Sequence, residues 1–215
     1  LLGIISLTIV REVLVMTTKE RIMDVALHMF SERGYEAVSI RDICGEVGIK
    51  ESTLYYHFTN KMDILDSLIA KFKDHINGLL SHIDEMPQMP SGKTKKKNAG
   101  STDIIDSYMM DSYLFDPFCN LMIRLMMIEQ FHNEEMRALY EKTMFTDPYD
   151  IYLRVFRMLA TQGTFPESQV DAIVRRYHAY MTMLTYRYLL NGELTEERKK
   201  VYKKEVHALM NGGVI

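Results

Sequence analysis

The polar side chains between Lys50 and His57 are the residues of this chain whose types and spacing favour a defined chemistry. The segment reads KESTLYYH. If Leu54 and Phe58, four residues apart, face inward on a helix, the remaining side chains face solvent or a partner. An amine, hydroxyls and phenols in that arrangement suit phosphate groups and base edges, including the methyl group of thymine. The segment therefore predicts a helix that enters the major groove of DNA.

The chain before this helix has the pattern of two further helices. Apolar residues at three- and four-residue steps predict a helix over 18–33, with Thr18 as its N-cap and a glycine directly after it. A second helix begins at Ser39, which forms an S-x-x-D capping box with Asp42, and Gly48 breaks it. Two short helices joined by a glycine-containing turn form the helix-turn-helix pattern of DNA-binding proteins.

Lys61 lies near the start of the next predicted helix, where a phosphate would also meet free backbone amides. We expect the DNA contacts of this unit to come from hydroxyl, aromatic and basic side chains, namely Thr18, Ser39, Arg41, Lys50, Ser52, Thr53, Tyr55, Tyr56, His57 and Lys61.

These residues resemble the TetR family of transcriptional regulators over Arg21 to Leu65. The resemblance rests on A-L-x-x-F-x-x-x-G-Y in the first helix and its turn, followed by S-x-R-x-I-x-x-x-x-G-I-x-x-x-T-L-Y-Y-H-F-x-N-K-x-x-x-L. It implies an all-α protein, with a three-helix DNA-binding domain before a helical domain for effector binding and dimerisation. Lys50-Glu51-Ser52 replaces a more usual Ser-basic-Gly sequence, and Cys44 stands where alanine is common, so the base contacts stay open.

The charge of the chain gives no general affinity for nucleic acid. The formal net charge is -3 at pH 7, and residues 17–62 hold six basic and seven acidic side chains. A protein that coats DNA through a basic surface is therefore not expected. Specific placement in the groove, repeated in a dimer, explains DNA binding better, and its affinity should fall as salt rises.

The first fifteen residues are apolar and start without methionine. They lack the basic leading region of a signal peptide and are too short to cross a bilayer. We expect Met16 to be the natural start and residues 1–15 to be a non-native leader; a short extra helix and a membrane anchor are the alternatives. Two cysteines are too few for a disulfide framework and suit a reducing cytoplasm.

The remaining chain reads as an all-α body. We assign 16–62 to the DNA-binding domain and 63–215 to the body, with a loop at about 86–102 whose lysines are solvated or add a phosphate contact. Helices are expected over 61–83, over 103–131 with a break at Asp116-Pro117, over 133–145, from 146 to Gly163, over 168–190 and over 195–210.

The middle of the body is rich in methionine and tyrosine, which can form an adaptable apolar wall around a ligand. Plain core packing is the competing interpretation for each single residue. The candidate cavity residues are Tyr108, Met109, Tyr113, Phe118, Met122, Met126, Phe131, Tyr152, Phe156, Tyr177 and Met181. The implied effector is a small, largely apolar molecule.

The resemblance further implies that the last two long helices pair with those of a second subunit. The candidate interface residues are Val174, His178, Leu184, Thr185, Tyr188, Tyr202, Val206 and Leu209. A two-fold dimer matches a palindromic operator with half-sites about 34 Å apart. We expect a homodimeric repressor that an effector releases from DNA; an activator, a corepressor-dependent repressor and a regulator whose body binds another protein are the alternatives.

Other reactive residue types have plainer interpretations. His132, Glu134 and Glu135 suggest a metal site, but adjacent residues face different ways on a helix, so a helix start explains them better. Cys44 and Cys119 are expected to be buried small residues and not redox sensors. The nucleophile elbow, the phosphate loop and the HExxH motif are missing, so we expect no cofactor and no enzymatic activity.

Overall fold

The computed structural model describes residues 16–85 and 109–211. The segments expected to be a leader (1–15) and a loop (86–102), and Tyr108, lie outside the described residues. The chain divides into two compact units, Leu1–His75 and Ile76–Ile215. This division falls further along the same helix than the boundary expected between Met62 and Asp63. The expected all-α fold is confirmed, since the described residues hold helices and no strand.

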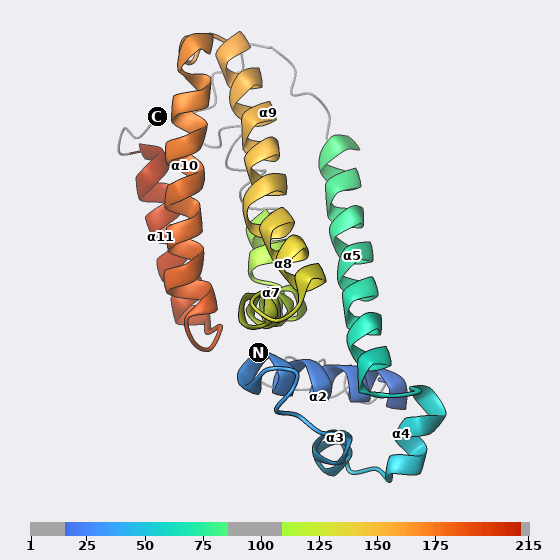
Figure 1. The fold of residues 1–215 in the computed structure, drawn as a ribbon. Helices are drawn as coiled ribbons and strands as arrows, with labels where there is room; N and C mark the ends of the chain where they lie inside the picture. Colours follow the sequence, from blue (N-terminus) through green and yellow to red (C-terminus); the bar gives the residue numbers. More distant parts are fainter. Residues whose placement is uncertain (1–15, 86–108, 212–215) are drawn as a thin grey trace. The chain divides into compact units, whose positions relative to one another are not determined.

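The first unit contains the expected helices (Figure 1). They are α2 (Thr18–Arg33), α3 (Ile40–Val47), α4 (Glu51–His57) and the start of the 25-residue α5 (Lys61–Glu85). The N-cap of α2 is Thr17 and not Thr18: the Thr17 hydroxyl accepts a hydrogen bond from the Glu20 amide, and the Glu20 carboxylate accepts one from the Thr17 amide. Threonine and glutamate at this spacing form a capping box, so Thr18 is the first helical residue.

The turns of the first unit follow the expected chemistry. Ser39 and Asp42 form the second capping box, and Gly48 ends α3 with φ 76°, ψ 36°, a left-handed conformation that glycine adopts without steric cost. Arg21 of α2 donates to the Val47 carbonyl at 3.0 Å and so satisfies a terminal carbonyl of α3. The core consists of fully buried side chains from all four helices, including Ile22, Phe30, Ile43, Leu54, Phe58, Ile64 and Phe72.

The second unit is built on long helices that lie side by side, α9 (Asp147–Thr161), α10 (Val170–Leu184) and α11 (Glu196–Asn211) (Figure 1). Two shorter helices, α7 (Pro117–Glu129) and α8 (Glu134–Glu141), pack against each other. Three π-helical turns complete it, η1 (Met110–Leu114), η2 (Lys142–Thr146) and η4 (Thr185–Leu190), with a short 3₁₀ turn η3 (Glu167–Gln169) before α10.

Two expected helix boundaries are corrected. The helices over 133–145 and from 146 onward form one continuous helical stretch, because η2 joins α8 to α9 without leaving right-handed helical conformation. The single helix expected over 168–190 is α10 followed by the wider η4 turn. The 3.6-residue pattern that predicts helices does not reveal a π turn, since one extra residue only shifts the pattern locally.

Pro148 explains where the first of these joints lies. A proline has no N–H, so it leaves its α-helical partner at i−4, the Met144 carbonyl, without that donor. Its π-helical partner at i−5 is the Thr143 carbonyl. Both carbonyls accept hydrogen bonds from side chains instead, Met144 from His178 at 3.2 Å and Thr143 from Tyr113 at 3.4 Å. A buried carbonyl needs a hydrogen-bond donor. At this joint the donors are polar side chains inside the body, because the backbone N–H is missing.

The core of the second unit is made mainly by α9, α10, η4 and α11. Its fully buried members include Phe156, Val174, Tyr177, Leu184, Leu189 and Tyr202. Arg198 of α11 donates to the carbonyls of Arg187, Tyr188 and Asn191, which ties α11 to the end of the η4 turn. Among the described residues, the longest apolar helical stretches fall short of what a bilayer crossing needs.

Candidate nucleic-acid interface and body cavity

Helix α4 presents the aromatic surface that its spacing predicted. Leu54 is fully buried and Phe58 is 2% exposed, so both anchor the helix to the core. Tyr56 is 84% and Tyr55 51% exposed. Large phenols rarely stay this open without a partner, because their burial would stabilise the fold. The outer face of α4 therefore has side chains available to a macromolecular surface.

The polar neighbours of these tyrosines frame the same face. Lys50 is the N-cap of α4, makes no side-chain capping bond and is exposed, as is Ser52. Thr53 and His57 are half-buried, and the His57 ring meets the edge of Tyr56 with ring centroids 5.1 Å apart. Cations and hydroxyls around exposed phenols match the mixed phosphate and base contacts of a groove-reading helix.

The remaining candidates of this unit have intramolecular roles. Ser39 donates its hydroxyl to Asp42 at 2.6 Å, and these hydrogen bonds lower the pKa of the Asp42 carboxyl. Arg41 lies 3.8 Å from Glu51, which offsets the acidic charge beside Lys50. Thr18 is half-buried in the first turn of α2.

Lys61 is the most engaged of the predicted DNA contacts. Its ammonium donates to the carbonyls of Tyr35 at 2.8 Å and Val38 at 2.9 Å, and it lies 4.1 Å from the centre of the Tyr35 ring. An ammonium has three N–H donors, so two serve the turn between α2 and α3. The first role of Lys61 is therefore to hold this turn against the start of α5.

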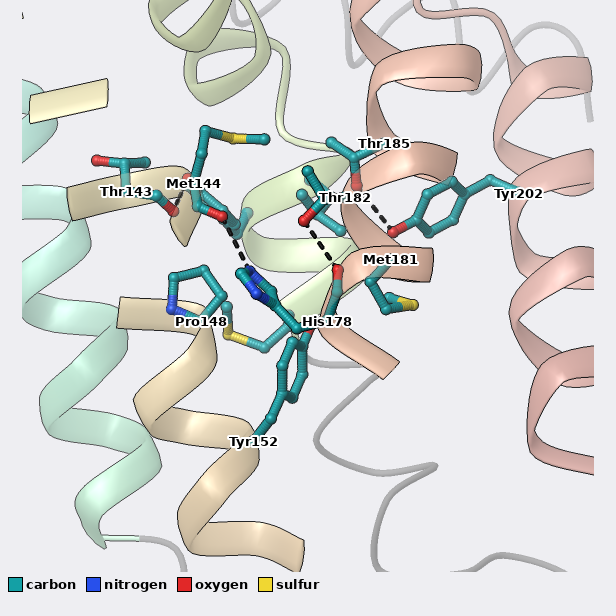
Figure 2. A pocket seen from close by; sticks show the side chains of 12 residues that line it. Thr143, Met144, Pro148, Tyr152, His178, Met181, Thr182, Thr185 and Tyr202 are labelled. Atoms are coloured by element: carbon teal, nitrogen blue, oxygen red, sulfur yellow. Dashed lines mark hydrogen bonds between the residues drawn. The ribbon is translucent and has the colours of Figure 1, made fainter. Parts of the chain in front are cut away.

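The body contains a small cavity at the meeting point of the three π turns (Figure 2). Its volume is about 30 Å³, room for about two water molecules. The η1 turn contributes Tyr113 and Leu114, η2 contributes Thr143 and Met144, and η4 contributes Thr185. The other lining residues are Met109, Pro148, Tyr152, His178, Met181, Thr182 and Tyr202. π turns are frequent at functional sites.

The polar groups of this first cavity bind one another. Figure 2 shows His178 under the Met144 carbonyl and the hydroxyls of Thr185 and Tyr202 facing each other, 3.1 Å apart. Thr182 donates its hydroxyl to the His178 carbonyl at 2.8 Å. Burial lowers the pKa of His178, although its hydrogen bond to Met144 acts in the opposite direction. The imidazole is therefore neutral at pH 7.

A second cavity of about 20 Å³ adjoins the first. The two share Met109, Tyr113, Thr143 and Pro148 in their walls, and the rest of the second wall is mainly aliphatic: Ile76, Leu79, Leu80, Asp147 and Ile151. Burial raises the pKa of the Tyr113 phenol well above its usual value, so it stays a protonated donor. Tyr113 and Met109 thus belong to the walls of both cavities, of which the first holds most of the hydrogen-bonding groups and the second is mainly aliphatic.

The structure brings together only part of the predicted cavity wall. Met109, Tyr113, Tyr152 and Met181 line the first cavity. Met122, Met126, Phe156 and Tyr177 are core residues outside both linings, and Phe118 and the 80% exposed Phe131 also lie outside them. Sequence reasoning missed Thr143, Met144 and Thr182; the signal that could have found the first two was Pro148, whose missing N–H marks the joint.

Most of the predicted interface residues are buried in the core of one subunit. Val174, Leu184, Tyr202, Val206 and Leu209 belong to the core of the second unit. His178, Thr185 and Tyr202 line the first cavity, and Tyr188 is half-buried. The buried members of this set have little side-chain surface to offer a second subunit, so the exposed residues of α10 and α11 are the better candidates for pairing.

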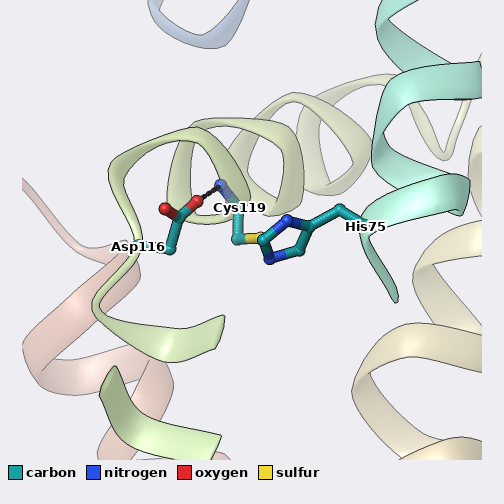
Figure 3. A group of neighbouring side chains, drawn as sticks. All are labelled: His75, Asp116 and Cys119. Carbon is teal, nitrogen blue, oxygen red and sulfur yellow. Dashed lines mark hydrogen bonds between the residues drawn. The ribbon is translucent and has the colours of Figure 1, made fainter. Parts of the chain in front are cut away.

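The two cysteines and the acidic residues at the start of α8 have structural roles. Asp116 caps α7 by accepting a hydrogen bond from the Cys119 amide at 2.8 Å (Figure 3). Burial raises the thiol pKa of both Cys119 and Cys44, which keeps them protonated and unreactive. At the start of α8, Asn133 is the N-cap, and Glu134 pairs with Arg137 at 2.7 Å.

The chain is similar in sequence to bacterial transcriptional regulators. Residues 22–68 match the family model of bacterial regulatory proteins, tetR family. The biofilm operon icaADBC negative transcriptional regulator IcaR of Staphylococcus aureus is 37% identical over 62 residues, which cover 29% of this chain and 33% of IcaR. The chain thus aligns with only a third of that relative. The transcriptional repressor KstR2 of Mycolicibacterium smegmatis is 24% identical over 198 residues, 91% of this chain and 90% of KstR2.

Solved structures share the fold over most of the chain. A transcriptional regulator from Saccharomonospora viridis in complex with choline superimposes with a TM-score of 0.61 at 20% identity, covering 91% of this chain and 96% of the other. A regulator from Aquifex aeolicus gives a TM-score of 0.55 at 17% identity, over 90% and 99% of the two chains. At such identities the likeness concerns the fold alone.

Proposed function

The chain belongs to the TetR family of transcriptional regulators, and we propose that it is a homodimeric repressor that a small, largely apolar effector releases from a palindromic operator. It would act in the cytoplasm, where it meets DNA. The observation that carries the DNA-binding part is the open face of α4, where Tyr55 and Tyr56 stand exposed beside Lys50 and Ser52.

The exposed side of α10 supports the homodimer. Ala172, Arg176, Ala179 and Met183 of α10, and Tyr186 in the η4 turn that continues it, are all exposed and recur at steps of four and three residues. Such a stripe occupies one side of a helix, and small residues let a second helix approach closely. Met183 is 42% and Tyr186 55% exposed, so pairing two copies here would remove apolar surface from water. This stripe replaces the buried residues as the proposed interface.

The cavity where η1, η2 and η4 meet supports the effector part. Its wall combines methionines, which adapt to different shapes, with a few hydrogen-bonding groups, the usual composition of a small-molecule site. A ligand that favours a body conformation with poor spacing of the two α4 helices would weaken DNA binding by a coupling free energy of about 1–3 kcal/mol.

Selection of operator DNA from a random duplex library tests the DNA-binding part. The purified full chain should enrich a palindrome, and footprints should cover two half-sites about one helical turn apart. Tyr56→Ala should weaken binding to the selected site by about tenfold or more. Met62→Ala is the matched control, because Met62 is also exposed in this unit but lies outside α4. No enrichment, or equal affinity for both variants, would contradict the proposal.

A thermal-shift screen with metabolites and drugs tests the effector part. A true ligand raises the melting temperature by mass action, and it should also lower affinity for the selected operator. Stabilising compounds that strengthen DNA binding would instead identify a corepressor.

A further inference from the structure

We infer that the two adjoining cavities form one elongated site for an uncharged molecule with a hydrocarbon chain and a single hydrogen-bond donor, such as a hydroxyl, at one end. This inference rests on the proposed effector site and specifies its ligand. The donor group of the ligand would lie near His178, Thr182 and Thr185. Its hydrocarbon chain would pass Tyr113 and Met109 into the second cavity.

The walls of the two cavities offer no net charge to a ligand. Among the described residues that line the two cavities, lysine and arginine are missing, and the single carboxylate is Asp147. Lys142 donates to both carboxylate oxygens of Asp147, at 2.5 and 2.7 Å. His178 is neutral because burial lowers its pKa. A charged ligand would lose its hydration here without gaining a counter-charge. Its desolvation free energy would therefore be larger than that of a neutral ligand.

The hydrogen-bonding atoms near His178, Thr182 and Thr185 are mainly acceptors. A carbonyl can only accept, so the His178 Nε2 atom that meets the Met144 carbonyl carries the hydrogen, and Nδ1 of the neutral ring keeps a lone pair. Thr182 uses its hydrogen on the His178 carbonyl, and its oxygen also keeps lone pairs. The Thr185 oxygen keeps a lone pair in either direction of its bond to Tyr202. Thr185 and Tyr202 share one hydrogen bond and so leave at most one hydroxyl hydrogen for a ligand. Three acceptors against this one hydrogen favour a ligand that donates.

The two chambers adjoin each other and differ in their linings. They share four wall residues, and the far chamber is lined mainly by Ile76, Leu79, Leu80 and Ile151. Each chamber alone holds about one or two waters, so a ligand must displace side chains as it enters. The shared Met109 has three rotatable side-chain bonds and can move aside with little strain. Two narrow adjoining chambers suit a hydrocarbon chain better than a compact ring system.

The test is calorimetric titration of the full-length protein with four matched probes: 1-octanol, 1-methoxyheptane, octanoate and octyltrimethylammonium. Octanol should bind about tenfold more tightly than the ether, which has the same number of heavy atoms but no donor. It should also bind at least tenfold more tightly than both ions. From 1-butanol to 1-octanol, each methylene should strengthen binding about threefold to fourfold. Equal or tighter binding of an ion or of the ether would overturn the inference.

Variants locate the binding. Leu79→Trp fills the far chamber, so 1-butanol should still bind while the gain per added methylene disappears. Ile173→Phe, a buried enlargement outside both walls, should keep that gain. Thr185→Val and His178→Phe each remove an acceptor and should reduce the preference for octanol over the ether by about threefold or more. An unchanged preference in both variants would overturn the placement of the polar end.

DNA binding separates this inference from the proposed function. If a library compound releases the operator while no alcohol binds, the ligand class is wrong and the repressor function stands. If alcohols bind as expected but never change operator affinity, the site stands and its role as the effector site fails.

Discussion

Lys61 shows why a residue's type and position do not settle its role. A lysine beside a predicted DNA-reading helix suits a phosphate, yet its ammonium donates to the Tyr35 and Val38 carbonyls. Those carbonyls belong to the turn that orients α3, and so indirectly α4. Loss of Lys61 would therefore act first on the fold of the DNA-binding unit, and any weaker DNA binding would follow from that.

Lys61→Ala should lower the free energy of unfolding by about 1–3 kcal/mol, because two buried carbonyls lose a charged donor. Urea denaturation followed by circular dichroism measures the change. Lys50→Ala serves as the control, since Lys50 is exposed and makes no side-chain capping bond, and should change stability by less than about 0.5 kcal/mol. Equal stability of the two variants would show that the carbonyl contacts contribute little.

His178 should make stability depend on pH. Its pKa in the folded state lies below the ordinary value of 6.5, so the unfolded chain takes up this proton first as pH falls. Stability is full above about pH 6.5 and declines below it. His178→Gln, which keeps an N–H donor for Met144, should show a smaller drop in melting temperature between about pH 7.5 and 5.5. The seven histidines of the chain make the difference between the two proteins the informative quantity; identical drops would contradict the assignment.

At the scale of elements, the sequence predicts structure well where one local signal decides it. The capping box at Ser39, the glycines after α2 and α3, and the pair Leu54 and Phe58 all act within a few residues, and the structure follows them. The π turns depend on what the rest of the body offers to the released carbonyls, such as His178 from another helix. The cavity formed by these turns was therefore only partly predictable.

Two glycines near the end of α3 should respond in opposite ways to alanine. Gly48 has φ 76°, so Gly48→Ala should cost about 1–2 kcal/mol. Gly45 lies within α3, and a Cβ there meets nothing within 4 Å; Gly45→Ala should stabilise by about 0.5–1 kcal/mol. Chemical denaturation of both variants checks the signs. Destabilisation by Gly45→Ala would mean that the open space beside α3 is used in the folded protein.

At the scale of the whole molecule, the family could be predicted but the pairing residues could not. The motif that identifies the family lies in one short stretch, from Arg21 to Leu65. Helix α10, in contrast, has apolar residues on two sides, and either side could pair. Periodicity alone does not say whether Leu184 or Met183 faces the core. The structure answers this, since Leu184 is 1% exposed and Met183 is open to solvent.

Met183→Glu should give folded monomers that bind operator poorly, because the charge falls on the proposed pairing stripe. Leu184→Glu, one residue later, should instead unfold the body, since it buries a charge in the core. Sedimentation velocity and circular dichroism distinguish the two outcomes. Folded dimers of Met183→Glu at micromolar concentration would show that the α10 stripe is not the interface.

The narrowness of the paired cavities has a consequence for the dose at which the protein would respond. If the closed form predominates and only a minor open form admits ligand, the apparent dissociation constant rises by the inverse of the open fraction. An open fraction of about one per cent would raise the half-response concentration about a hundredfold. The protein would then respond only when its effector has accumulated. Replacing Met109 or Met144 by a smaller residue would lower the half-response concentration without adding a contact to the ligand.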